Sequence, residues 1–254
     1  MIMRYNISGV FMKKNIKKIN INYELYGEGT DTIVLLHGWG QNIEMMKPIG
    51  DHMKKNHQIL IVDLPGHGLS DEPDFAWTLF DYVEAIKELI EELKLKKVTL
   101  IGHSFGGKIS LLYASMHKVE KVVVFGSPYK KKVKKETLKL KVLKFAKKIP
   151  GVNKLEEFAK KHIGSTDYKN ASPIMREILV NHVNCDITED VKNIKCPTLI
   201  IWGTKDYTVS INEAYELEKL IPDSAVIAYE NCTHYAYLEN LGQTINVLDS
   251  FIKE

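Results

Sequence analysis

Residues 98–107 read VTLIGHSFGG, an apolar run followed by a serine that has a glycine two positions away on each side. The segment from Gly102 to Gly106 fits the pattern Gly-x-Ser-x-Gly, in which a sharp turn joins a strand to a helix. Glycine suits this turn because side chains at the flanking positions would clash with the strained serine backbone. The turn places the serine hydroxyl at a helix N-terminus, where free N–H groups favour negative charge. The stretch therefore predicts a nucleophile at Ser104.

Short β-rich runs alternate with helical patterns through most of the chain. Most of these runs are almost entirely apolar, which is typical of strands buried on both faces of a parallel sheet. The expected strands are 19–26, 32–36, 58–63, 97–102, 121–126, 197–202 and 225–229, with the residues before 19 pairing as a hairpin. The expected helices are 42–55, 78–95, 105–117, 211–221 and 240–253. This alternation predicts an α/β fold with a doubly wound, mostly parallel sheet of eight strands.

One interval breaks the alternation. About 70 residues separate the strand ending at 126 from the strand starting at 197, far more than one crossover helix requires. Helical patterns occur there near 136–149, 153–163 and 173–184. We expect a helical cap at 129–190, inserted after the sixth strand, and a core formed by 1–128 and 191–254.

Bulk composition is that of a globular protein, with 44% hydrophobic and 26% charged residues in 254. The longest apolar runs are too short to span a membrane, and the first residues lack the pattern of a secretory signal. The three cysteines form no Cys-x-x-Cys pair and are odd in number. A reduced, cytoplasmic setting is therefore expected.

A lysine-rich run lies at the start of the expected cap. Residues 129–148 contain ten lysines and one acid, so this run carries +9 while the rest of the chain carries −6. Charge runs are usually solvated helix faces, and we favour that interpretation. The run also offers a surface for weak contact with anionic membranes or acidic substrates, and we expect no nucleic-acid partner.

Two further polar residues come after later strands. Asp206 lies shortly after the strand 197–202, and His234 after the strand 225–229. One helix and one strand fit between them, so both side chains return to the same edge of the sheet as Ser104. A nucleophilic serine needs a base and a group that orients that base.

Five blocks of the chain together resemble α/β-hydrolases of the lidded esterase type. The blocks are LLHGWG (35–40), DLPGHGLSD (63–71), GHSFGG (102–107), IIWGTKD (200–206) and CTHYAYLEN (232–240). The resemblance implies a catalytic triad of Ser104, Asp206 and His234. It also implies an oxyanion hole made by the backbone N–H groups of Trp39 and Phe105.

Three other residues of these blocks, His37, Gly38 and His103, are expected to bind substrate or support the site. His37 and His103 would hold the surrounding loops in place, while Asp63 and His67 would be structural. The resemblance implies no metal and no organic cofactor.

The expected activity is hydrolysis of a carboxylic ester with a short to medium acyl chain, through an acyl-enzyme on Ser104. Thioesterases, lysophospholipases or monoacylglycerol lipases, acyltransferases and carbon–carbon bond hydrolases use the same triad and stay open as alternatives. A ligand receptor built on a hydrolase scaffold is the alternative without catalysis. The expected partner is a small-molecule ester.

Overall fold

The computed structural model describes residues 11–131 and 166–253. Its strands form one sheet in the order β1-β2-β4-β3-β5-β6-β7-β8. The two ladders that involve β2 are antiparallel, and the other five are parallel. The strands are β1 (Met12–Ile16), β2 (Ile19–Tyr26), β3 (Thr32–Leu36), β4 (Gln58–Val62), β5 (Val98–His103), β6 (Lys121–Phe125), β7 (Thr198–Gly203) and β8 (Ser224–Tyr229). The predicted α/β fold with a mostly parallel eight-stranded sheet is confirmed.

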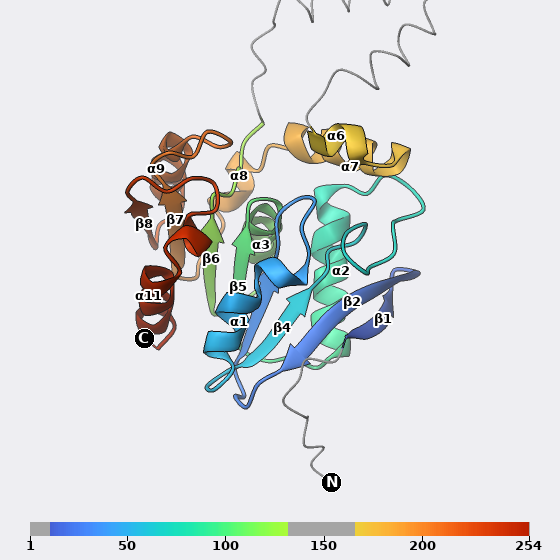
Figure 1. The fold of residues 1–254 in the computed structure, drawn as a ribbon, viewed down its shortest axis with the longest axis horizontal. Helices are drawn as coiled ribbons and strands as arrows, with labels where there is room; N and C mark the ends of the chain where they lie inside the picture. The colour runs from blue at the N-terminus through green and yellow to red at the C-terminus, as the bar shows by residue number, and fades with distance from the viewer. Residues whose placement is uncertain (1–10, 132–165, 254) are drawn as a thin grey trace, which may run out of the picture.

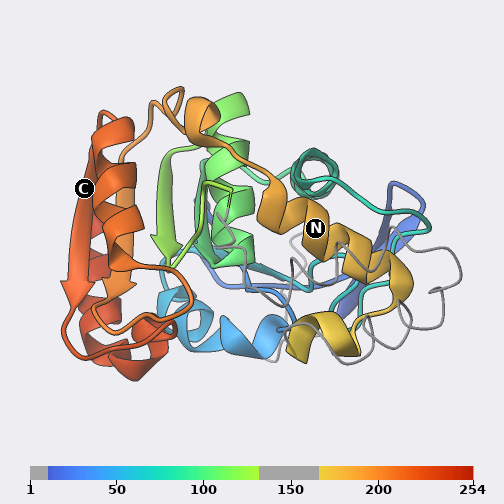
Figure 2. The same cartoon turned by 90° about the horizontal axis from the view of Figure 1, so that it is seen from above.

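Helices cover both faces of the sheet (Figures 1 and 2). On one face lie α2 (Leu79–Glu92), α3 (Phe105–Met116), α8 (Thr188–Val191) and α9 (Ile211–Leu220). On the other lie η1 (Ile43–Met45), α1 (Lys47–Met53), α10 (Ala236–Glu239) and α11 (Leu241–Lys253). Each face has its own apolar core, because β3 to β7 are almost completely buried on both sides.

The segment 42–55, predicted as one helix, is divided into η1 and α1. Pro48 lies in the first turn of α1. Proline is tolerated there, but its ring clashes with the carbonyl four residues earlier in a continuous helix. The prediction of a single helix is therefore wrong at this point.

Between β6 and β7, the described residues form α6 (Thr166–Asn170), α7 (Pro173–Asn184) and α8. Helix α7 matches the predicted helix 173–184 and, with α6, lies over the carboxyl ends of the parallel strands (Figure 1). The helical patterns at 136–149 and 153–163, with most of the lysine run, lie outside the described residues. The division into a core and a cap at 129–190 stays a prediction.

In the part of the chain that the structure describes, no helix combines the length and apolarity of a membrane span.

Candidate active site

Ser104 lies at the turn between β5 and α3, and its backbone is in an unusual conformation, with φ 50° and ψ −107°. Its N–H donates to the carbonyl of Phe125 at 2.9 Å, which ties the turn to the end of β6. A Cβ atom at Gly106 would lie 2.3 Å from the carbonyl oxygen of Leu36. Glycine is therefore required for α3 to pack against the end of β3.

His234 and Asp206 form a partly buried pair. His234 Nδ1 lies 2.7 Å from Asp206 Oδ2, and the side chains are 12% and 0% exposed. The other carboxylate oxygen, Oδ1, accepts from the N–H groups of Thr208 at 2.8 Å and Val209 at 2.9 Å. These bonds fix the carboxylate, so it can hold one orientation of the imidazole.

The pair lies beside the turn that carries Ser104. A Cβ atom built on Gly126 would be 3.0 Å from His234 Nδ1 and 3.3 Å from Asp206 Oδ2. Gly126 comes directly after Phe125, the residue that accepts the Ser104 N–H. Among the described residues, the Ser104 hydroxyl makes no hydrogen bond, to His234 or to another group. Such bonds are often long in unliganded sites and tighten when substrate binds.

The loop after β3 faces the N-terminus of α3. Gly106 N–H donates to the His37 carbonyl at 3.1 Å, and the rings of Trp39 and Phe105 are 5.3 Å apart. Within residues 11–131 and 166–253, the backbone N–H groups of Trp39 and Phe105 have no hydrogen-bond partner. Phe105 directly follows Ser104, and its ring packs against the ring of Trp39, so both unpaired N–H groups belong to residues around this turn.

His37 connects this loop to the one after β4. Its Nδ1 lies 2.7 Å from the Gly38 carbonyl oxygen, and its Nε2 accepts from Leu64 N–H at 3.0 Å. Burial lowers the pKa of His37 to about 3, so its imidazole is neutral and Nδ1 carries the proton.

Gly38, Gln41 and His103 meet on the other side of the loop. Gly38 N–H donates to Gln41 Oε1 at 2.9 Å, and the same oxygen lies 3.2 Å from His103 Nδ1. His103 Nε2 is 3.0 Å from the carbonyl oxygen of His234. Burial lowers the pKa of His103 to about 3. A neutral imidazole carries one N–H, so His103 donates to only one of these two oxygens. Its ring lies between the loop after β3 and the loop that carries His234.

Asp63 holds backbone in place. Its carboxylate accepts from the N–H groups of Ile43 and Leu69 and from the Asn22 amide, each at 2.8 Å. His67 Nδ1 lies 3.1 Å from the Pro65 carbonyl, and its ring meets Trp39 edge-on at 4.8 Å. Burial lowers the pKa of His67.

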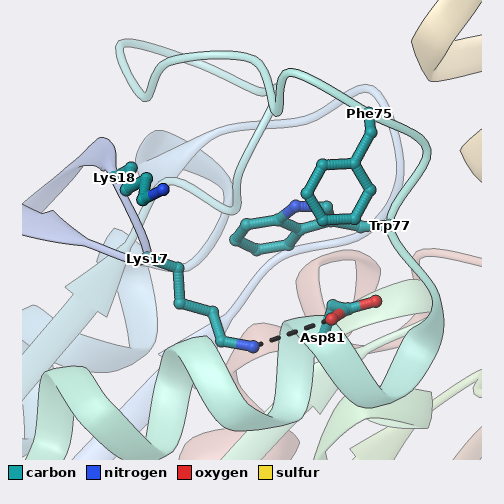
Figure 3. A pocket seen from close by; sticks show the side chains of 5 residues that line it. All are labelled: Lys17, Lys18, Phe75, Trp77 and Asp81. Atoms are coloured by element: carbon teal, nitrogen blue, oxygen red, sulfur yellow. Dashed lines mark ion pairs between the residues drawn. The ribbon is translucent and has the colours of Figure 1, made fainter.

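Two hollows open at the surface of the described residues. One, of about 310 Å³, lies between the loop after β3, the loop after β4 and helices α6 and α7, with Trp39, Gly66, Glu72 and Met175 in its wall. The other, of about 270 Å³, lies beside the β1–β2 turn, at the opposite edge of the sheet from β8. Figure 3 shows that second hollow, where Lys17, paired with Asp81, lies near Trp77. The first hollow shares Trp39 with the loop after β3, and Ser104, Asp206 and His234 do not line it.

Three residues of this region were not predicted from the sequence: Gln41, Lys108 and His182. Lys108 lies in α3, is 1% exposed, and donates from Nζ to the carbonyls of His182 at 3.0 Å and Cys185 at 2.6 Å. Burial lowers its pKa to about 8. Lys108 thereby connects α3 to the C-terminus of α7.

No cluster of three or more His, Cys, Asp or Glu side chains in the described ranges is arranged to hold a metal ion. The side chains gathered around the Ser104 turn are a serine hydroxyl, an imidazole and a carboxylate, from Ser104, His234 and Asp206.

The model of a known family, the alpha/beta hydrolase fold, matches residues 31–154 and 132–241. The chain therefore belongs to this family.

Among its relatives is a pimeloyl-[acyl-carrier protein] methyl ester esterase of Legionella pneumophila, 29% identical over 92% of this chain and 100% of that protein. The enzyme of the same name from Aliivibrio fischeri is 24% identical over 91% of this chain and 97% of that protein. A solved esterase from Exiguobacterium antarcticum superimposes with a TM-score of 0.76 at 25% identity, covering 97% of this chain and 100% of that one. A bromoperoxidase from Bacillus anthracis gives 0.77 at 24% identity, with the same coverage, and supports the fold alone.

Proposed function

We propose that the protein is a serine hydrolase that cleaves carboxylic esters with short to medium acyl chains. The observation that carries this proposal is the partly buried His234–Asp206 pair, with His234 Nδ1 and Asp206 Oδ2 2.7 Å apart, beside the strained turn of Ser104. The esterase names of relatives that match over nearly their whole length support an ester as the substrate.

In the proposed mechanism, Ser104 Oγ attacks the acyl carbon of the ester while His234 Nε2 accepts the hydroxyl proton. Asp206 holds the proton of His234 on Nδ1 and stabilises the imidazolium. The imidazolium then protonates the leaving alcohol, which departs and leaves an acyl group on Ser104. Water then attacks this acyl-enzyme while His234 Nε2 takes one of its protons. The bond between the acyl carbon and Ser104 Oγ breaks, the imidazolium returns its proton to Oγ, and the carboxylic acid is released.

The N–H groups of Trp39 and Phe105 are the proposed donors to the tetrahedral oxyanion. Both are backbone groups fixed by neighbouring bonds, so they need no reorganisation during the reaction. One such donor is typically worth roughly 10²–10³ in kcat.

A second candidate function is hydrolysis of the methyl ester of an acyl group that is carried on a protein. Two relatives whose names state this activity match over 97% and 100% of their own length. The run 129–148, with its net charge of +9, would complement a carrier with an acidic surface. This candidate uses the same triad and differs in how the substrate is recognised.

The test is hydrolysis of p-nitrophenyl esters and thioesters of increasing chain length by the wild type and Ser104→Ala. We expect Ser104→Ala to lower kcat by at least about 10³-fold, since a triad that loses its nucleophile keeps only background catalysis. Ser115→Ala, the same substitution further along α3, is the control and keeps wild-type rates.

Equal rates for Ser104→Ala and the wild type would overturn the proposed mechanism. An inactive wild type that a fluorophosphonate still labels at Ser104 would indicate a specialised substrate, such as a carrier-bound ester. Absence of labelling would favour a ligand receptor on a hydrolase scaffold.

A further inference from the structure

His182 is a buried histidine for which the proposed mechanism has no role. It belongs to the buried stripe of α7, together with Met175 and Ile178. Its side chain faces the start of α3, where its ring lies 4.4 Å from the ring of Phe105 in an edge-on arrangement. The Trp39 ring is parallel to it at 6.3 Å. His182 is therefore next to both residues that we propose as oxyanion donors.

The imidazole of His182 lacks hydrogen-bond partners among the described residues. Its Nδ1 is shielded from solvent and unpaired, and no bond to Nε2 is formed within residues 11–131 and 166–253. Buried polar side chains usually have a partner, and an exception calls for an explanation. The rings of Trp39 and Phe105 and the apolar side chains of the α7 stripe offer none.

The position of His182 is fixed through its backbone. Lys108 Nζ donates to the His182 carbonyl at 3.0 Å and to the Cys185 carbonyl at 2.6 Å. Lys108 is one turn after Ser104, the N-cap residue of α3, so the group that anchors His182 lies on the helix that begins at the proposed nucleophile. The backbone of His182 is held by Lys108, and its ring is held by packing against Phe105 and Trp39, so the unpaired nitrogens keep a defined direction.

The ring is uncharged, because burial holds the pKa of His182 well below its ordinary value and the nearby Lys108 charge lowers it further. A neutral imidazole has one nitrogen that donates and one that accepts. This pattern suits a hydroxyl or a keto group. A carboxylate is disfavoured, since it would lose its hydration among aromatic rings while Lys108 is engaged with two carbonyls.

We propose that His182 determines specificity by hydrogen-bonding an uncharged hydroxyl or keto group that the substrate carries close to its reacting carbonyl. The inference rests on the proposed ester hydrolysis at Ser104 and narrows its substrate class to hydroxyacyl or ketoacyl esters. The unpaired imidazole would then be satisfied only when such a substrate is bound.

The test compares p-nitrophenyl butanoate with its 2-hydroxy, 3-hydroxy and 3-keto analogues. We expect the wild type to prefer at least one polar analogue by roughly five- to tenfold in kcat/KM, the worth of one hydrogen bond between neutral groups. His182→Leu should bring this ratio close to one. His182→Asn retains a polar atom near the place of Nδ1, and His182→Gln near that of Nε2, so the variant that restores the preference identifies the nitrogen involved.

His52→Leu is the matched control, because His52 is a surface histidine that pairs with Asp249 on the other face of the sheet. It should keep the wild-type ratio. The melting temperature of His182→Leu should equal or exceed that of the wild type, since the substitution removes an unpaired buried polar group.

The two hypotheses fail in different ways. Ser104-dependent hydrolysis with no preference for a polar analogue, or with a preference that survives in His182→Leu, overturns the role of His182 and leaves the proposed function standing. A marked loss of melting temperature in His182→Leu would indicate a structural role instead. If no ester is hydrolysed, or if rates do not depend on Ser104, the proposed function fails and this inference fails with it.

Discussion

The two carboxylate oxygens of Asp206 have different partners. Oδ1 accepts from the N–H groups of Thr208 and Val209, while Oδ2 lies 2.7 Å from His234 Nδ1. Because Oδ1 is held by two donors, the side chain cannot turn without leaving those N–H groups unpaired. The orientation of Asp206 therefore determines which nitrogen of His234 carries a proton.

Asp206→Asn should lower kcat for p-nitrophenyl butanoate by roughly 10³–10⁴-fold with little change in fold. The two backbone donors would keep the amide oxygen at the place of Oδ1. The amide NH₂ would then face His234 Nδ1, force the ring proton onto Nε2, and leave no base for Ser104. Circular dichroism checks the fold, and Asp74→Asn in an exposed loop is the control. A variant that retains a third of the wild-type kcat would contradict this role.

At the residue scale, the positions that can be predicted from the sequence are those directly after a strand. Ser104, Asp206 and His234 each lie in or just after an apolar run, so strand order alone brings them to one edge. Gln41 and His182 have no such signal. Gln41 meets His103, 62 residues away, and His182 meets Lys108, 74 residues away, through contacts that exist only after the helices have packed.

At the level of elements, α3 and α7 are joined by a buried charge. The last carbonyls of a helix lack intrahelical partners, and a cation near them is favourable. Lys108 supplies two hydrogen bonds to the C-terminal end of α7 from a side chain that is almost completely buried. These hydrogen bonds are formed at the cost of a desolvation penalty, because the buried ammonium group of Lys108 loses its hydration.

This cost makes stability depend on pH. The pKa of Lys108 falls from 10.5 to about 8 on folding. Between pH 8 and 10.5 the unfolded chain binds more protons at this residue than the native one, so its contribution to the free energy of unfolding rises with pH. Below pH 8 both states are protonated and the contribution is constant.

Lys108→Met should therefore remove this part of the increase in the free energy of unfolding between pH 8 and 10.5. Urea unfolding of the wild type and the variant at several pH values measures that free energy. The stability of the variant relative to the wild type should fall from pH 8 to 10.5. Lys118→Met, an exposed lysine just after α3, should show no such trend. Parallel pH curves for the wild type and Lys108→Met would mean that Lys108 has the same pKa folded and unfolded.

Most helices and strands are predictable from the pattern of apolar residues in the sequence. The exceptions have local causes. Strands β3 to β7 are predictable because both of their faces are buried, which requires continuous apolar runs. Helix α2 begins where Thr78 and Asp81 cap each other, a signal visible in the sequence. The division of 42–55 depends on Pro48, and α10 (Ala236–Glu239) is too short to produce a periodic pattern.

At the scale of the whole molecule, charge is divided unevenly along the chain. The run 129–148 carries +9 and the remainder −6. The run starts at the carboxyl edge of the sheet, where Lys130 pairs with Glu216 of α9 and the Lys131 N–H donates to Asp186 at 3.1 Å. These described contacts place the first lysines on the same side of the sheet as the candidate site.

If the substrate is carrier-bound, as in the second candidate function, this placement predicts that its recognition depends on salt. The KM for a methyl ester on an acidic acyl-carrier protein should rise with ionic strength, because added salt screens attraction between surfaces of opposite charge. The KM for a small free ester should not change. Replacing the five lysines within 130–135 by glutamine should raise the carrier-substrate KM by roughly tenfold, at a few tenths of a kcal/mol per charge.

The control replaces five exposed lysines elsewhere by glutamine, which gives the same net charge: Lys55, Lys96, Lys118, Lys195 and Lys219. If both sets raise KM equally, net charge rather than the run 129–148 is responsible. If neither set matters, but the 130–135 variant loses salt-sensitive sedimentation with anionic liposomes, the run serves a lipid surface instead. Binding to neither partner would leave these lysines as a solvated face, because ion pairs exposed to water contribute little on their own.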